Sequence, residues 1–149
     1  MDETALCSVL LPAGDPPEWI QLMTPGALAA NDGRKWTLAD PAAVALASQP
    51  AGVDLVIDYE HQTEFTAKNG QKAIAGGWIK ELQARADGIW ARVDWTSAAA
   101  QHIRAREYRY ISPTFAHAKD GTVLRILRAA LTNSPALNLG NRGRNTDNN

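Results

Sequence analysis

Residues 79–95 read IKELQARADGIWARVDW, and this stretch decides how the rest of the chain is interpreted. Its Asp87-Gly88 step is a strong short-range signal for a β-hairpin. We therefore expect two long antiparallel strands at 73–84 and 89–95, joined across 85–88. All five tryptophans, three of them in this hairpin, are expected in the core rather than on a ligand-binding platform.

The chain before this hairpin predicts three strands and one helix. Strands are expected at 5–11 and 19–23, separated by a turn rich in proline and glycine, and a β-rich segment follows at 53–58. Asp40-Pro41 predicts a helix start, because the carboxylate can accept from free N–H groups and proline is tolerated at the first helical position. That helix should run to about Ser48.

The chain after the hairpin predicts one more helix and one more hairpin. Thr96 or Ser97 can cap a helix that runs to about Arg106. Strands at 108–115 and 122–131 flank a turn at Lys119-Asp120-Gly121. About seven strands and two helices, joined mainly by hairpins, predict an α+β, mainly antiparallel fold: a small closed or partly open β-barrel with about two flanking helices.

Composition and length set limits on the class of protein. A chain of 149 residues fits one domain, expected over 1–137, and the polar composition of 138–149 predicts a disordered tail. With 15 basic and 16 acidic side chains, the chain has no electrostatic footprint for nucleic acid. Its apolar runs are shorter than the ~20 residues of a membrane helix, and its first residues lack the basic start of a secretion signal. We expect a soluble cytoplasmic protein without a cofactor.

His61 and Ser112 are the candidate reactive pair. A serine hydroxyl attacks a carbonyl usefully only when a nearby base such as imidazole takes its proton. His61 should end the apolar face of the strand at 53–58. Asp58 and Glu60 could orient its ring only if the chain bulges or turns at Tyr59, because a regular strand points them to the other face.

Pro113 predicts where Ser112 lies in the sheet. Proline removes a ladder donor, so Ser112 should lie at a sheet edge, a bulge or a strand exit. The alternative for Ser112 is a hydroxyl that satisfies a backbone group beside the proline. The alternative for His61 is a partly buried ring bonded to backbone, and we expect His102 and His117 to be solvated surface residues.

Metal and thiol chemistry are weaker interpretations of the same sequence. Glu60 and His61 with His102 or His117 would supply three ligands, but no pair has the close helical spacing of a zinc hydrolase. Cys7, the single cysteine, cannot form an intrachain disulfide and should act as a small hydrophobe in its strand. We therefore expect no metal site and a reducing compartment.

Five ordered blocks lie between residues 53 and 137: Ile57 through Thr63, Ala75 through Ile79, Gly88 through Thr96, Tyr108 through Pro113, and Ala129 through Leu137. Together they resemble the Mu-like prophage I protein family, phage protease-scaffold proteins that process the interior of the procapsid. The layout is more distantly similar to prohead proteases and herpesvirus assembly proteases, which implies a small β-barrel surrounded by helices.

The resemblance implies roles for particular residues. His61 and Ser112 match, in order, the histidine after an early strand and the serine on a later strand. Many prohead proteases have an acidic residue in the last strand, where this chain has Arg128. A dyad without a third member stays open. For orienting the imidazole the candidates are Asn133, Asp58 and Glu60; for holding the oxyanion they are backbone N–H groups, Arg125 and Arg128.

The implied function is a serine endopeptidase of capsid maturation, which cleaves scaffold protein and itself inside the procapsid in the host bacterial cytoplasm. Scaffold protein and capsid subunits are the implied partners, and a homodimer is left open. Family members usually carry a long C-terminal scaffold region, so the resemblance leads us to expect a protease-domain fragment, a self-cleaved product or the product of a truncated prophage gene. The competing hypothesis is a non-catalytic assembly module with a degenerate protease fold.

Overall fold

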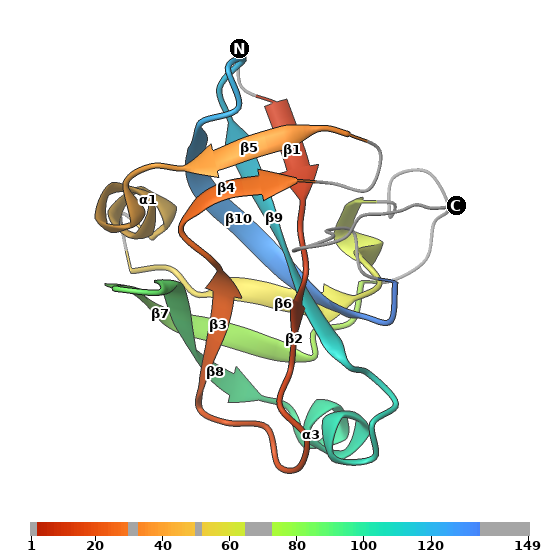
Figure 1. Ribbon diagram of the computed structural model, residues 1–149. Helices are drawn as coiled ribbons and strands as arrows, with labels where there is room; N and C mark the ends of the chain where they lie inside the picture. Colours follow the sequence, from red (N-terminus) through yellow and green to blue (C-terminus); the bar gives the residue numbers. More distant parts are fainter. Residues whose placement is uncertain (1–2, 30–32, 50–51, 65–72, 135–149) are drawn as a thin grey trace.

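The computed structural model describes residues 3–29, 33–49, 52–64 and 73–134 (Figure 1). Ten strands and two helices have their bounds within these ranges. In chain order they are β1 (Glu3–Leu6), β2 (Val9–Leu10), β3 (Trp19–Met23), β4 (Gly26–Ala29), β5 (Lys35–Leu38), α1 (Pro41–Ser48), β6 (Leu55–Tyr59), β7 (Gly77–Arg85), β8 (Gly88–Trp95), α3 (Ser97–Arg104), β9 (Tyr110–His117) and β10 (Val123–Thr132).

The main sheet has the strand order β1-β9-β10-β6-β7-β8-β3, and β2 pairs with β9 beside β1. Neighbouring strands are antiparallel except β10 and β6, which are parallel. The sheet curls into a half-barrel that brings its edge strand β3 against β2 and β9 (Figure 1). The predicted mainly antiparallel, strand-rich fold with few helices is confirmed, and the described sheet is partly open rather than closed.

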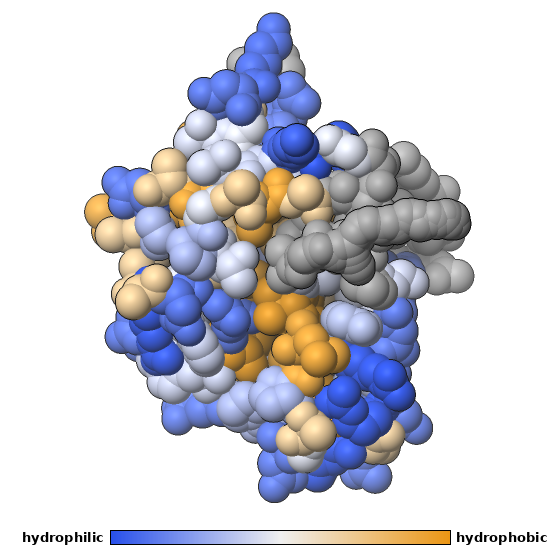
Figure 2. All heavy atoms as spheres, in the orientation of Figure 1, coloured by the Kyte–Doolittle hydropathy of each residue, from blue (hydrophilic) through white to orange (hydrophobic). Residues whose placement is uncertain are grey.

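The opening between β2 and β3 is apolar. Figure 2 shows hydrophobic atoms gathered in this gap, which is lined by Val9, Leu10, Leu11 and Ile20 among others. Leu10 is 59% exposed there, whereas Leu11 and Ile20 are each 2% exposed. An apolar hollow therefore lies at the seam of the half-barrel.

The two helices begin where their capping residues predict. The Asp40 carboxylate accepts a hydrogen bond from the Ala43 amide at 3.1 Å, and Pro41 opens α1. At the other end of α1, the Ser48 hydroxyl accepts from the Ile126 amide at 2.8 Å, which fixes the helix to β10. Thr96 caps α3 by accepting from the Ala99 amide at 3.2 Å.

A second, two-stranded sheet formed by β4 and β5 was not expected from the sequence. Gly26–Ala29 has little β-propensity, although Lys35–Leu38 alternates exposed and buried side chains. Trp36 of β5 packs edge to face on Phe115 of β9, with ring centroids 5.5 Å apart. The small sheet therefore covers one face of β9 and leaves Ser112 and Thr114 on the opposite face.

The expectation that all five tryptophans lie in the core is wrong. Trp36 is 3% exposed, but Trp78 is 41% exposed on the outer face of β7. Trp19 and Trp90 are half-buried because both pack against the Arg85 guanidinium, at 4.9 and 4.7 Å from the ring centroids. Trp78 and Trp90 of the hairpin thus lie on the outside of the sheet, whereas Trp95 packs against the core.

Candidate active site

Ser112 lies inside the sheet, in a strand with neighbours on both sides. Leu6 of β1 pairs with Thr114, and Val9 of β2 pairs with Ile111, three residues further along each strand, so the register is unbroken. On the other side Ser112 pairs with Ala130 of β10. The prediction of an edge, bulge or strand exit at Ser112 is therefore wrong.

Pro113 instead interrupts the neighbouring strand. The Cys7 amide donates to the Pro113 carbonyl at 3.3 Å, but proline has no N–H to donate back. The hydroxyl of Ser112 donates to the Cys7 carbonyl in its place. The strand expected at 5–11 is thus divided into β1 and β2, and the structure shows the backbone-satisfying role that the sequence left open for Ser112.

His61 leaves the strand instead of continuing its face. β6 ends at Tyr59, and Glu60 and His61 have φ angles of 51° and 56°, in the left-handed region. The Asp58 carboxylate accepts from the Thr63 amide at 2.8 Å, which closes this turn. The expectation that His61 shares the strand face is wrong, and the turn required near Tyr59 is present.

The turn brings the two predicted residues together. His61 Nε2 lies 2.9 Å from Ser112 Oγ, although the residues are 51 positions apart in sequence. Asp58, Ala130 and Ser112 form one row across β6, β10 and β9. Because the small Ala130 lies between the other two, the turn that follows Asp58 can place His61 against Ser112.

The other ring nitrogen of His61 faces two oxygens. Nδ1 lies 3.3 Å from Thr114 Oγ1 and 3.8 Å from Glu64 Oε2. Glu64 also forms an ion pair through Oε1 with Nη1 of Arg128, which pairs with Thr114 in the β9–β10 register. Sequence reasoning missed Glu64, whose spacing of three residues after His61 becomes a signal only when a helical turn follows β6.

The Glu64 carboxyl is tuned by these neighbours. Burial by itself raises the pKa of Glu64, but the nearby His61 and the positive charge of Arg128 outweigh it. The pKa therefore lies below its ordinary value. Oε2 is buried and lacks a hydrogen-bond partner among the described residues, and it lies 3.8 Å from Nδ1 of His61.

The other predicted orienting residues are not brought to the imidazole. Asp58 bonds the Thr63 amide, and the Glu60 carboxylate accepts from the Thr132 hydroxyl at 2.7 Å. Asn133 accepts from the Arg109 amide at 3.1 Å and donates to the Glu107 carbonyl at 2.7 Å. These contacts hold the turn and the start of β9, and they make all three residues supports of the scaffold around the pair.

The two predicted oxyanion cations lie on β10. Arg128 directs its guanidinium to Glu64, which gives it a different partner from the one expected. Arg125 pairs with Ala116, further along β9 from Ser112 than Thr114 is. An oxyanion contact from Arg125 stays a prediction.

The remaining histidines and the cysteine lie in other surroundings. His117 is 8% exposed and packs on Trp36 and Phe115, so its expected surface position is wrong. His102 is half-buried and bonds Glu107 through Nδ1 at 2.7 Å.

Within the part of the chain that the structure describes, no group of three metal-ligating side chains is found. Burial raises the pKa of the Cys7 thiol, which disfavours a thiolate nucleophile.

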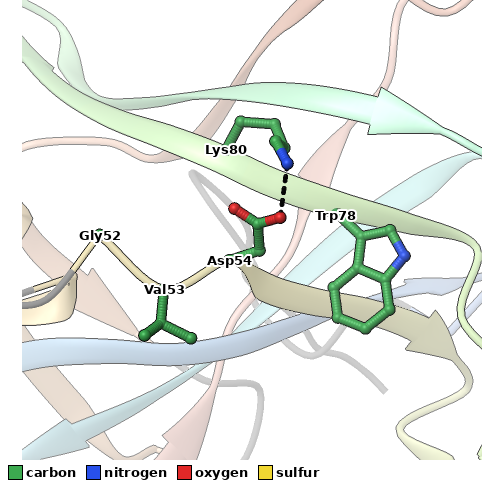
Figure 3. Close-up of a pocket in the computed structure, with 5 residues that line it drawn as sticks. All are labelled: Gly52, Val53, Asp54, Trp78 and Lys80. Carbon is green, nitrogen blue, oxygen red and sulfur yellow. Dashed lines mark hydrogen bonds and ion pairs between the residues drawn. The ribbon is translucent and has the colours of Figure 1, made fainter.

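A hollow on the outside of the sheet offers fewer reactive side chains than the site around Ser112. It is lined by Gly52, Val53, Asp54, Trp78 and Lys80, with Lys80 Nζ 2.6 Å from Asp54 Oδ2 (Figure 3). These residues supply an ion pair and an indole but no hydroxyl or thiol nucleophile. Ser112 and His61 therefore remain the candidate active site.

Comparison with known proteins identifies a matching family and two similar phage proteins. The family described as "Mu-like prophage I protein, N-terminal domain" matches residues 20–141. The chain is 30% identical to the Mu-like prophage FluMu I protein of Haemophilus influenzae, over 91% of this chain and 43% of that protein. It is 33% identical to Protease I of Escherichia phage Mu, over 78% of this chain and 37% of that protein.

The chain thus spans about two fifths of the length of these relatives. No solved structure matches it. Among the described residues, no helix has both the length and the apolar character needed to cross a membrane.

Proposed function

Because the chain belongs to the Mu-like prophage I protein family, we propose that it is a serine endopeptidase that processes phage proteins during capsid assembly. The name of its relative, Protease I of phage Mu, supports a protease or assembly role. The observation that carries the proposal is the 2.9 Å contact between His61 Nε2 and Ser112 Oγ. A working nucleophile and its base need a separation of about 2.6–3.2 Å.

Both steps of peptide hydrolysis can pass through this pair. Ser112 Oγ forms a bond to the peptide carbonyl carbon while its proton moves to His61 Nε2. The C–N bond then breaks, the leaving amine takes that proton, and an acyl-enzyme remains. Water attacks the acyl carbon, gives a proton to His61, and the C–O bond to Ser112 breaks as Oγ regains the proton.

The buried surroundings of the pair support this chemistry. Ser112 is 1% exposed and His61 is 7% exposed, so the interaction between them is weakly screened by solvent. For Nε2 to accept the serine proton, the neutral ring must carry its own proton on Nδ1, which faces the Thr114 hydroxyl. We propose scaffold protein and the enzyme itself as substrates, Arg125 as an oxyanion donor, and residues 1–137 as the protease domain.

A second candidate is a non-catalytic module that docks scaffold or shell subunits. It is favoured by the hydrogen bond from Ser112 to the Cys7 carbonyl, because a hydroxyl committed to a backbone acceptor is not donating to His61. In that case the pair is a structural remnant, and the half-barrel itself is the functional surface. The two hypotheses differ in whether Ser112 reacts.

Labelling with a fluorophosphonate tests the proposal. The wild-type chain should acquire one adduct on Ser112, located by peptide mass spectrometry, and Ser112→Ala should acquire none. His61→Gln leaves the Ser112–Cys7 bond in place and should slow labelling about 10²–10⁴-fold, the usual contribution of a general base. Equal labelling of wild type and Ser112→Ala would reject the protease.

Co-expression with a candidate scaffold protein gives the second arm of the test. Intact mass should show cleavage with the wild-type chain and no cleavage with Ser112→Ala or His61→Gln. Circular dichroism must first show that each variant is folded, because Ser112→Ala leaves the buried Cys7 carbonyl without its donor, at a cost of about 1–3 kcal/mol. The same products from all three chains would leave only the assembly module.

A further inference from the structure

We propose that Glu64 is the positioning carboxylate of this site and that Arg128 holds it behind His61. The inference rests on the proposed function of Ser112 and His61 and adds two residues to it. Glu64 lies beside the imidazole nitrogen that does not face the nucleophile, with Oε2 3.8 Å from Nδ1. Arg128 acts through Glu64 and does not touch the reacting atoms.

The position of Glu64 is set from two directions. The turn after β6, closed by the bond from the Thr63 amide to Asp58, carries both His61 and Glu64. Arg128 reaches Glu64 from β10, which belongs to the main sheet. The backbone of Glu64 is held in the turn and its carboxylate is held by Arg128. Glu64 can therefore hold the His61 ring, which otherwise rotates about its side-chain torsions.

Burial argues that the arrangement is more than a surface ion pair. The Glu64 and Arg128 side chains are 22% and 27% exposed, and Glu64 Oε2 is buried without a hydrogen-bond partner among the described residues. A buried carboxylate oxygen without a partner is costly unless it serves a nearby donor or positive charge. The Nδ1–H group of His61, which lies 3.3 Å from the Thr114 hydroxyl oxygen, is such a donor, and a modest movement of the ring would bring it from 3.8 Å into hydrogen-bond range of Oε2.

The negative charge of Glu64 suits a base, His61, that gains a proton during the reaction. Negative charge on Glu64 favours the protonated ring that forms when Ser112 attacks. Without Glu64, the positive charge of Arg128, which pairs with Thr114 in the β9–β10 register, would oppose that protonation. Glu64 therefore both orients the imidazole and separates it from Arg128.

The test compares Glu64→Gln with wild type by two measurements. The first is the fluorophosphonate labelling rate of Ser112, which should fall at least about tenfold. The second is the proton position on His61, read from the ¹⁵N shifts of the ring: wild type should carry it on Nδ1, and Glu64→Gln should shift the population toward Nε2. Glu81→Gln, which removes the acid of the exposed Glu81–Arg92 pair on β7 and β8, is the matched control and should change neither.

Arg128→Met separates a positioning role from a merely structural one. If Arg128 acts through Glu64, the double variant Glu64→Gln/Arg128→Met should label no more slowly than Glu64→Gln alone. Additive losses would contradict this part of the inference. Glu64→Asp keeps the charge on a shorter side chain and should label at a rate between those of wild type and Glu64→Gln.

The outcomes distinguish this inference from the proposed function. If wild type labels on Ser112 but Glu64→Gln labels equally fast with an unchanged ring tautomer, Glu64 is not the positioning residue and the Ser112–His61 pair stands. If wild type does not label at all, the proposed function fails, and the tautomer measurement still reports whether Glu64 orients His61. An unchanged tautomer would overturn the inference in either case.

Discussion

Two acceptors compete for the single proton of Ser112. The Cys7 carbonyl takes it in the structure, and His61 Nε2 lies 2.9 Å from the same oxygen. The competition arises because Pro113 has no N–H for Cys7, so one proline both creates a place for the hydroxyl and sets its resting partner. In the proposed mechanism, rotation of the Ser112 hydroxyl redirects its hydrogen bond from the Cys7 carbonyl to the imidazole, which then takes the proton as Oγ attacks.

Glu64 gives the folded state a characteristic acid response. Its pKa is lowered from the ordinary value of 4.5, so near that pH the folded chain binds fewer protons at this site than the unfolded chain does. The stability that ionised Glu64 contributes is therefore present above pH 4.5 and is lost as pH falls through the lower folded value. Urea unfolding between pH 7 and pH 3 should show wild type and Glu64→Gln converging below pH 4.5. A constant difference would contradict this origin of the stability.

For individual residues, the sequence predicted the pair of His61 and Ser112 but not the support that Glu64 gives to His61. His61 and Ser112 were found through the order of two motifs, which survives whatever path the chain takes between them. Asp58 and Glu60 were considered for the third place because they adjoin His61, but the left-handed backbone at Glu60 and His61 turns the ring toward Glu64. Two consecutive non-glycine residues in that conformation have no local sequence signature.

Among the strands and turns, the hairpin of β7 and β8 was expected with its turn across residues 85–88, where the turn lies, but β7 begins at Gly77 and not at residue 73 as expected. Arg85 pairs with Gly88, so Ala86 and Asp87 form the two-residue loop, and Gly88 opens β8 with a φ angle of 123°. A Cβ on Gly88 would lie 1.9 Å from the Met23 carbonyl oxygen of β3. The glycine is therefore needed because another strand passes close to it, as well as for its backbone conformation.

Gly88→Ala should destabilise the protein by more than about 4 kcal/mol, because the clash is with the backbone of β3 and cannot be relieved by a side-chain rotation. Gly14→Ala is the matched control: its φ angle of 95° is also left-handed, but a Cβ there meets nothing within 4 Å. The control should cost only the conformational strain, about 1–2 kcal/mol. Urea midpoints measure both, and equal losses would show that close approach of β3 plays no part.

Elements were predictable where local signals agreed with tertiary contacts. The caps at Asp40 and Thr96 placed both helices because capping is a short-range interaction. The break between β1 and β2 could not be placed, because it depends on Pro113, more than a hundred residues away in the neighbouring strand. The β4 strand was missed because its alanine and glycine residues are extended only through pairing with β5.

In the molecule as a whole, β9 and β10 join the first strands of the chain to the rest of the main sheet. β9 lies between the first two strands of the chain and β10, while β10 joins that half to β6, β7 and β8. The site is at this junction, with Ser112 on β9, Arg128 on β10 and His61 after β6. A mixed sheet with one parallel pair was not predicted, because hairpin signals reveal only neighbours in sequence.

This topology predicts that the folding unit begins before the family match, which starts at residue 20. β1 and β2 precede that point, yet they cover the outer edge of β9 and bury Ala5, Cys7 and Leu11 to 4% exposure or less. Removing residues 1–19 would expose a long apolar strand edge and delete buried side chains. A large buried side chain such as Leu11 is worth about 2–5 kcal/mol against a total stability of about 5–15 kcal/mol.

A chain that begins at residue 20 should therefore be unfolded or aggregated, as judged by size-exclusion chromatography and by loss of a cooperative urea transition. A chain that ends at Leu137 is the control, since 138–149 has too little apolar composition to contribute to a core, and its urea midpoint should match that of the full chain. A synthetic peptide of residues 1–11 added to the shortened chain should restore fluorophosphonate labelling only if it pairs with β9 and returns the Cys7 carbonyl to Ser112. Cooperative unfolding of the shortened chain at an unchanged midpoint would show that β9 does not need these strands.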